Sequence, residues 1–383
     1  MEPGRRYHAL DALRAAMMLL GIVLHAMASY TSYPLGDAWP YRDPQTSYHF
    51  NLPLFVIHIF RMPAFFAMAG FFAALLYHRG GLRRLLVNRA RRVLLPFLIF
   101  WIALAPLVAG GFLFAIHEGT GAPVRDIIAQ HSKTTPVTTM HLWFLYFLLI
   151  FYAASAVVIV ASRGRSLRPD LCAALTASRW SAPIWIGISL LTLLPMTVPG
   201  IEGSTLLLPP VRTLLAYGVF FVFGWLLFVA RERLEVLAGR IGWHLALGLL
   251  GVAGYIYIEV GNPLEDPHAS HAAACAAMAA SMWGFVLGLI GLFLRLVSRE
   301  LPVVRYLSNA AYWTYLVHLP IVIVVVGALA RVPLHAFAKF VVVVTVTTAA
   351  CLGSYHALVR RTVIGVLLNG TREQRPAQPL QQL

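Results

Sequence analysis

Long apolar runs separated by short polar connections make up nearly the whole chain. A helix needs about 20 apolar residues to cross the roughly 30 Å hydrocarbon core of a bilayer. The pattern therefore predicts an all-α fold, a polytopic transmembrane helix bundle of about ten helices, of which the fifth and seventh are the weakest. The predicted spans lie near residues 11–32, 50–77, 93–115, 138–162, 182–199, 211–230, 241–259, 271–297, 309–330 and 335–359.

Composition agrees with a membrane protein. Of the 383 residues, 59% are hydrophobic and 12% are charged, whereas soluble domains average roughly 25% charged residues. The net charge of +15 comes from basic residues in short patches between apolar runs. Such patches favour anchoring against anionic lipid over binding in a nucleic-acid groove. We therefore expect the lipid bilayer as a partner, and no nucleic acid.

The distribution of basic residues predicts the orientation of the bundle. Most of the 30 Lys and Arg residues fall in alternate connections, those that are cytoplasmic if the N-terminus is inside. The positive-inside rule then predicts an N-in/C-in topology with an even number of spans. We expect the transmembrane domain to cover residues 1–362, followed by a cytoplasmic polar tail at 363–383. The basic N-terminal stretch is interpreted as part of a retained first helix, because no cleavage site precedes a soluble domain.

Cysteine and histidine spacing gives no sign of a structural metal or a disulfide framework. Cys172, Cys275 and Cys351 are far apart and form no CxxC motif, and no HxxxH or HExxH pair is present. We expect no metal site.

The first predicted helix carries two polar residues on one face. Arg14 and His25 are eleven residues apart, which is about three helical turns and about 16 Å of rise. Arg14 is expected near the cytoplasmic edge, within reach of Asp11, and His25 well inside the bilayer. Arg14 can also be a positive-inside anchor and His25 an interhelical hydrogen-bond partner. Their shared face favours a functional role.

The second helix carries His58 and Arg61, which share a face at i, i+3. A charge in the middle of a span costs about 2.5–3.5 kcal/mol on insertion scales, so it calls for a reason. A structural ion pair is one explanation, but no membrane-embedded acid is an obvious partner for Arg61. The alternative is that His25, His58 and Arg61 converge on one buried pocket.

A basic stretch over residues 79–92 follows the second helix. It can act only as a topology anchor, or it can form a cytoplasmic anion-binding entrance, in which Arg89 and Arg92 are the candidate ligands, because arginine suits bidentate phosphate recognition. Three further candidates are His141, Trp143 and His318. For Trp143 and His318, an interfacial belt position and simple packing within a helix are the alternatives to a functional role.

These residues lie in short motifs. The chain carries Leu10-Asp11-Ala-Leu-Arg14, the spacing from Arg14 to His25, and Arg89-x-x-Arg92 before Pro96. In these motifs it resembles the acyltransferase-3 superfamily of membrane acyltransferases.

Four further motifs are His58-Ile-Phe60-Arg61-Met62, Phe65-Phe66-x-x-x-Gly70, His141-Leu-Trp143-Phe144-Leu145 and Tyr312-x-x-Tyr315-Leu-x-His318. In these the chain is most similar to the branch associated with succinylation of osmoregulated periplasmic glucans. The family often has Ser-Gly where this chain has Ala69-Gly70, so one hydroxyl is missing.

The resemblance implies an O-acyltransferase of the bacterial inner membrane that has no permanently bound cofactor. Cytoplasmic acyl-CoA (succinyl-CoA or acetyl-CoA) would be the donor, with its phosphates near Arg14, Arg89 and Arg92. His25 would be the general base toward a hydroxyl of a periplasmic glycan acceptor. His58 or Arg61 would stabilise the oxyanion or hold an acidic acyl carboxylate. The remaining candidates, His141, Trp143 and His318, would contact substrate.

The competing interpretation is a transporter or exporter of a small anionic or glycan molecule. Secondary transporters also place polar residues at mid-membrane on facing helices, but they usually show inverted repeats and broken helices, and neither is evident in this sequence. The expected partners are thus acyl-CoA, a glycan acceptor and the bilayer, with a homo-oligomer as a further option.

Overall fold

The computed structural model describes residues 7–131, 138–201, 203–261, 263–297, 299 and 301–370, and in these ranges its regular secondary structure is helical. The all-α prediction is confirmed. The longer helices are α1 (His8–Ala28), α2 (Asn51–Arg89), α3 (Leu95–Thr120), α5 (Trp143–Ala161), α7 (Ser181–Leu193), α8 (Val211–Val229), α10 (Ile241–Gly261), α11 (Pro267–Leu296), α12 (Pro302–Ala328) and α13 (Ala336–Ser354). Short helices lie in the connections: α4 (Val124–His131), α6 (Pro169–Thr176), α9 (Glu235–Ala238) and α14 (Val363–Asn369).

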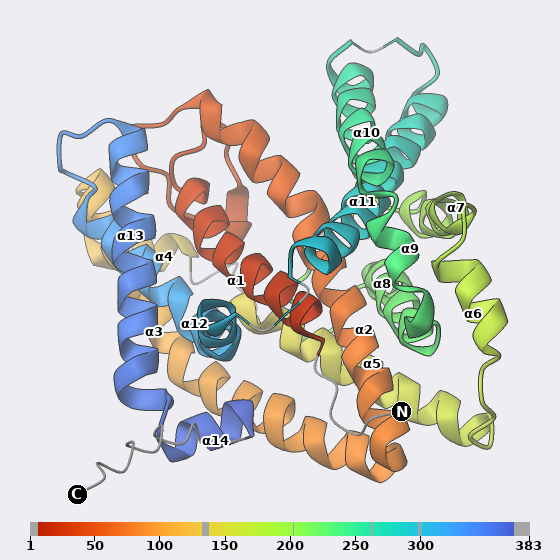
Figure 1. Ribbon diagram of the computed structural model, residues 1–383. Helices are drawn as coiled ribbons and strands as arrows, with labels where there is room; N and C mark the ends of the chain where they lie inside the picture. The colour runs from red at the N-terminus through yellow and green to blue at the C-terminus, as the bar shows by residue number, and fades with distance from the viewer. Residues whose placement is uncertain are drawn as a thin grey trace, which may run out of the picture.

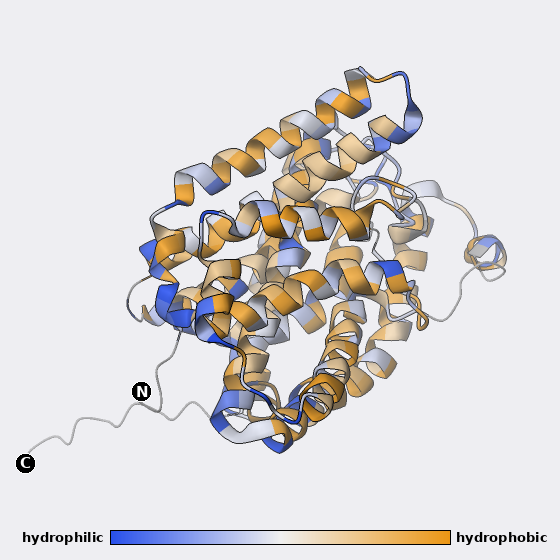
Figure 2. Cartoon of the chain, turned by 90° about the vertical axis from the view of Figure 1, so that its right-hand side faces the viewer, coloured by the Kyte–Doolittle hydropathy of each residue, from blue (hydrophilic) through white to orange (hydrophobic). Residues whose placement is uncertain are grey.

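Eight helical runs in the described ranges are long and apolar enough to cross a membrane. One of them, Tyr48–Thr120, is 73 residues long and holds two predicted spans. Its backbone leaves helical geometry at Gly80 and Gly81, where Gly81 has a φ of +67° that favours glycine. Apolar residues follow the lengths of the helices, and hydrophilic ones gather mostly at their ends (Figure 2).

The two weakest predicted spans have different outcomes. Segment 241–259 forms α10, a full helix of 21 residues. Segment 182–199 forms only α7, which has 13 residues and is therefore about 20 Å long, short of the hydrocarbon thickness. The chain leaves helical geometry after Leu193, just before Pro195, which cannot donate a helical hydrogen bond.

The beginning of the predicted polar tail is ordered as α14, which packs against α12 and the π-helical turn Ala90–Leu94. Residues 371–383 of that tail lie outside the described residues. The N-in/C-in orientation stays a prediction.

Helices α1 and α12 lie side by side at the centre of the bundle, between α3 and α13 on one flank and α2 and α8 on the other (Figure 1). Where α2 crosses α8, Gly70 and Gly224 bring the two backbones into contact. A Cβ at Gly70 would meet the Phe221 carbonyl, and one at Gly224 would meet the Ala67 carbonyl. The glycine of the Ala69-Gly70 pair is therefore required by helix packing.

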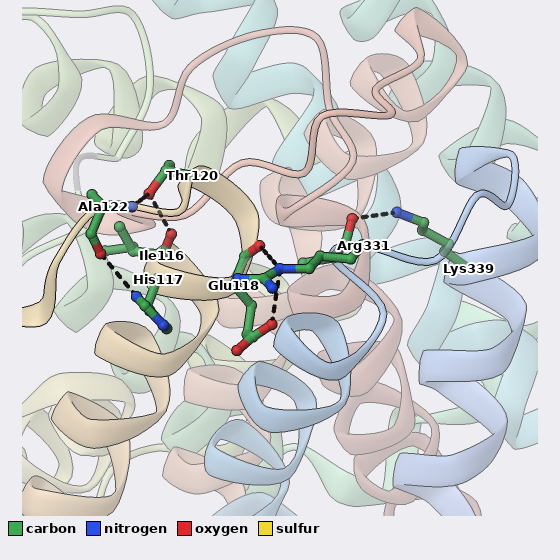
Figure 3. A network of polar contacts seen from close by, with 8 residues as sticks. Ile116, His117, Glu118, Thr120, Ala122, Arg331 and Lys339 are labelled. Carbon is green, nitrogen blue, oxygen red and sulfur yellow. Dashed lines mark hydrogen bonds and ion pairs between the residues drawn. The ribbon is translucent and has the colours of Figure 1, made fainter.

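The connection between α1 and α2 is held to α13 by a fully buried ion pair. Lys339 Nζ donates to both carboxylate oxygens of Asp43, at 2.9 and 3.0 Å, and to the Ala330 carbonyl at 3.3 Å. Both side chains of the pair are 0% exposed. Nearby, Arg331 pairs with Glu118 of α3 at 3.1 Å, but its side chain is 64% exposed. Figure 3 shows Lys339 and the Arg331–Glu118 pair at this end of the molecule.

We predict that Lys339→Met lowers the free energy of unfolding by about 3–5 kcal/mol, because it leaves the Asp43 carboxylate buried without its cation. Arg331→Ala is the matched control and should cost only about 0–1 kcal/mol, since its ion pair is solvated. Denaturant unfolding of both variants in mild detergent measures the difference. Equal losses for the two variants would contradict the assigned role of the buried pair.

Candidate active site

Two histidines from the central helices face each other. The ring centroids of His25 on α1 and His318 on α12 are 5.2 Å apart. At the other end of the same helix pair, the Ser308 hydroxyl of α12 donates to the Asp11 carbonyl of α1 at 3.0 Å. The two helices therefore run in the same direction, and α12 accompanies α1 from Asp11 to His25.

The backbone of α12 fixes the protonation of His318. Its Nδ1 lies 2.8 Å from the Tyr315 carbonyl and 3.0 Å from the Thr314 carbonyl. A carbonyl can only accept, so Nδ1 carries the proton and Nε2 is left as an acceptor; this tautomer is inferred from the bonds. His318 is buried, and its Nε2 has no hydrogen-bond partner among the described residues.

A third histidine joins from the 3₁₀ turn η4 (Met140–Leu142) before α5. His141 Nε2 lies 3.0 Å from the Leu316 carbonyl, and its ring is perpendicular to that of His318 at a centroid distance of 5.5 Å. The Leu316 carbonyl is available because Pro320, four residues later in α12, has no N–H to bond with it. The Tyr315 hydroxyl also donates to the His141 carbonyl at 2.7 Å.

Arg61 of α2 brings a positive charge to this cluster. Its side chain is buried, and no described carboxylate forms an ion pair with it. A Cβ added at Gly21 of α1 would lie 2.7 Å from Arg61 Nη1 and 3.9 Å from His318 Nε2. The missing side chain of Gly21 is what lets the guanidinium approach α1 beside His318.

His25 and His58 are the more accessible members of the predicted set. His25 is partly exposed, and its ring stacks on Trp39 at 5.5 Å. His58 is exposed one turn before Arg61. The structure thus gathers His25, Arg61, His141 and His318, and leaves His58 at the accessible side of Arg61.

Trp143 lies apart from the histidines. Its ring packs against Phe66, Phe147 and Tyr217 in an aromatic cluster. No ring contact joins it to His25, His141 or His318 in the described structure.

The predicted arginines lie toward the other end of α12. Arg14 pairs with Asp11 at 3.1 Å, as the sequence predicts. The Arg89 guanidinium lies over the Tyr152 ring at 4.9 Å, and the Arg92 carbonyl accepts a hydrogen bond from the Tyr312 hydroxyl at 2.8 Å.

Helix α12 therefore connects two polar regions. Ser308 and Tyr312 contact the segments that carry the arginines, and His318 lies in the histidine cluster. Ten residues separate Ser308 from His318, which is about 15 Å along a helix. Arg14 and His25 on α1 are eleven residues apart, about 16 Å, so two adjacent helices span nearly the same interval between the arginines and the histidines.

Three residues of the site were not among the sequence candidates: Gly21, Trp39 and Pro320. The role of Pro320 could have been predicted from the sequence, since a proline within a helix leaves the carbonyl four residues earlier without its helical hydrogen bond. Gly21 is one of several glycines in apolar helices, and Trp39 lies in an irregular connection. For these two, nothing in the local sequence indicates the contact.

Comparison with known proteins identifies the family. An acyltransferase domain, the acyltransferase-3 type, matches residues 7–356. The chain belongs to the acyltransferase-3 family. Its relatives include the glucans biosynthesis protein C of Salmonella schwarzengrund (strain CVM19633) and of Salmonella heidelberg (strain SL476). Each of these is 26% identical over 326 residues, covering 83% of both chains. No solved structure matches this acyltransferase.

We predict that Pro320→Ala lowers acyltransferase activity by roughly 10–100-fold, because a restored helical N–H competes with His141 for the Leu316 carbonyl and shifts that histidine. Pro106→Ala in α3 also restores a helical N–H, but Pro106 is exposed on the bundle surface, so this variant should keep its activity. Activity and thermal stability of both variants are measured together. Wild-type activity of the Pro320 variant would show that the bond does not position His141.

Proposed function

We propose that the protein transfers an acyl group from cytoplasmic acyl-CoA to a hydroxyl of a glycan on the other side of the bacterial inner membrane. One observation carries the proposal: three histidines meet an arginine that no described carboxylate pairs with, at one end of the α1–α12 pair. Arginines lie toward its other end. The separation suits a donor whose anionic part and reactive thioester are at opposite ends.

The arginines bind the phosphates of acyl-CoA in this scheme. Arg89 is the last residue of α2, and Arg92 lies on the π-helical turn that follows. Arg14 of α1 lies over the Phe72 ring of α2 at 5.7 Å. Guanidinium groups form bidentate hydrogen bonds with phosphate. The pantetheine arm then runs along α1 and α12 toward His25.

The histidine cluster carries out the chemical step. The acceptor hydroxyl attacks the thioester carbonyl carbon while His25 accepts the hydroxyl proton. The new C–O bond gives a tetrahedral oxyanion, which then collapses by breaking the C–S bond. The leaving thiolate takes the proton back from His25. His25 has this role because it is partly exposed, whereas His141 and His318 are buried.

Arg61 stabilises the oxyanion. No described carboxylate pairs with this buried cation, so its charge is available for the negative oxygen of the transition state. Such preorganised groups contribute about 2.7–4 kcal/mol each. His318 and His141 each donate one ring N–H to a backbone carbonyl. Their remaining ring nitrogens can accept hydrogen bonds from hydroxyls of the glycan and so orient it. His58 lies on the accessible side, where it can contact the incoming glycan or an acidic acyl group.

The acyl group is succinyl and the acceptor is a glucan in this proposal. The names of the relatives support a glucan acceptor, because they are glucans biosynthesis proteins. Acetyl transfer to a polysaccharide is the nearest alternative. Purified protein supplied with labelled succinyl-CoA or acetyl-CoA and a glucan separates the two, and it also tests the transporter alternative, in which no label is incorporated.

We predict that His25→Ala reduces acyl transfer by about 10²–10⁴-fold in correctly inserted protein, because the proton of the attacking hydroxyl loses its acceptor. His268→Ala removes an exposed histidine from the start of α11 and is the control. Incorporation of labelled acyl group into glucan is the measurement. Transfer by the His25 variant at the wild-type rate would exclude this residue as the base.

We predict that Arg89→Ala raises the KM for acyl-CoA by about tenfold or more, since a charge-assisted contact to phosphate contributes about 1.5–3 kcal/mol. The KM for the glucan should change little. Arg125→Ala, an exposed arginine in α4 after the far end of α3, is the control. An unchanged donor KM in the Arg89 variant would remove this residue from the donor site.

A further inference from the structure

The connection between α1 and α2 forms a pocket of about 260 Å³ just beyond the histidine cluster. Its lining includes Ala28, Tyr33, Trp39, Tyr41 and Arg42. Ala28 is the last residue of α1 and lies one turn after His25. The pocket is therefore at the end of α1 opposite Arg14, on the side where the proposed acceptor arrives.

Trp39 is shared by the pocket and the candidate active site. Its ring stacks on the ring of His25 with an interplanar angle of 22°. Its edge is fixed by a hydrogen bond from Nε1 to the Ser29 hydroxyl at 2.8 Å, and by an edge-to-face contact with Phe112. A ligand in the pocket therefore lies against the residue that covers the proposed base.

The accessible part of the lining combines an aromatic face with polar groups. Tyr33 is 66% exposed, and Arg42 is also exposed, with Nη1 3.4 Å from the Ser32 carbonyl. Tyr41 is buried, so it supports the pocket from below rather than offering its hydroxyl to a ligand. The Tyr33 ring and the Arg42 guanidinium together offer a stacking surface and several hydrogen-bond donors.

Hydrogen bonds fix the conformation of this connection at both ends. The Asn51 side chain accepts from the Thr31 hydroxyl at 2.6 Å and from the Ser32 amide at 3.2 Å. Next to Arg42, Asp43 is anchored by its buried ion pair with Lys339. The pocket is thus preformed, which lowers the entropy cost of binding a ligand.

We infer that this pocket binds one sugar ring of the acceptor glycan, next to the ring whose hydroxyl reaches His25. A sugar ring packs its C–H face on an aromatic side chain and presents hydroxyls around its edge, and the lining matches both features. The volume is below the roughly 300–1,000 Å³ of drug-sized sites, which suits a single ring. The inference rests on the proposed function, because it takes the acceptor to be a glycan.

Direct binding tests the pocket without relying on catalysis. The full-length protein in nanodiscs is titrated with a linear glucan hexasaccharide, and binding is followed by calorimetry and saturation-transfer NMR. We predict that Tyr33→Ala and Arg42→Gln each raise the Kd by about tenfold, as expected for the loss of one stacking or charged contact. Tyr48→Ala is the matched control. Tyr48 is 70% exposed in the same connection, but its ring lies against that of His49 and does not line the pocket.

Steady-state acyl transfer with the same variants separates the two proposals. If the pocket holds the glycan, the loss in kcat/KM of the Tyr33 and Arg42 variants appears in the KM for glucan rather than in kcat. Glucan binding that is weakened in these variants, with no transfer by any form of the protein, supports the pocket and overturns the proposed function. Failure of the wild-type protein to bind the hexasaccharide, or equal Kd values for the Tyr33 and Tyr48 variants, overturns the pocket.

Discussion

The hydrogen bond from His141 Nε2 to the Leu316 carbonyl joins two segments that are 175 residues apart in the sequence. A helix interior normally uses all its carbonyls, so a side chain from elsewhere finds no acceptor there. Pro320 changes this because it has no backbone N–H, so the Leu316 carbonyl accepts no helical hydrogen bond. The Tyr315 hydroxyl donates back to the His141 carbonyl, so the start of α5 is fixed on α12 by two bonds in opposite directions. This attachment sets the position of His318 relative to His141.

The pairing of histidine N–H groups with backbone carbonyls also explains the chemical character of the cluster. An apolar bundle penalises unpaired N–H groups, and His141 and His318 each place one nitrogen against a backbone carbonyl. Each then has one nitrogen left that can only accept. Arg61 contributes a cation that no described carboxylate neutralises. The result is a set of proton acceptors beside one positive charge, and acyl transfer needs both.

The fold was predictable from the sequence to the extent that hydropathy decides it. Each predicted apolar segment contains a helix, because a run of apolar residues in a bilayer has to satisfy its own backbone hydrogen bonds. The exception in length is α7, where the apolar composition continues past Leu193 but the backbone turns near Pro195. Helical periodicity also predicted that Arg14 can pair with Asp11, which the structure shows. It further predicted that Arg14 and His25 share one helix face.

Contacts between distant segments were beyond the reach of the sequence. For His318 the sequence left simple packing within a helix as an alternative, yet its ring contacts those of both His25 and His141, because α12 packs in parallel beside α1. The partnership of Asp43 and Lys339 was also missed, since one lies in an irregular connection and the other near the start of α13. Periodicity describes one element at a time and gives no information on which elements meet.

A rigid connection over the histidine cluster has a mechanistic advantage. Acyl transfer to water competes with transfer to a hydroxyl whenever a thioester lies beside a general base. Trp39 stacks on His25 and is itself held by Ser29, so its ring covers one face of the proposed base. An acceptor bound beside Trp39 can place its hydroxyl at the remaining accessible side, near His58, while the buried side is closed by His318 and Arg61. These contacts limit access to the proposed base and thus favour an ordered acceptor over bulk water.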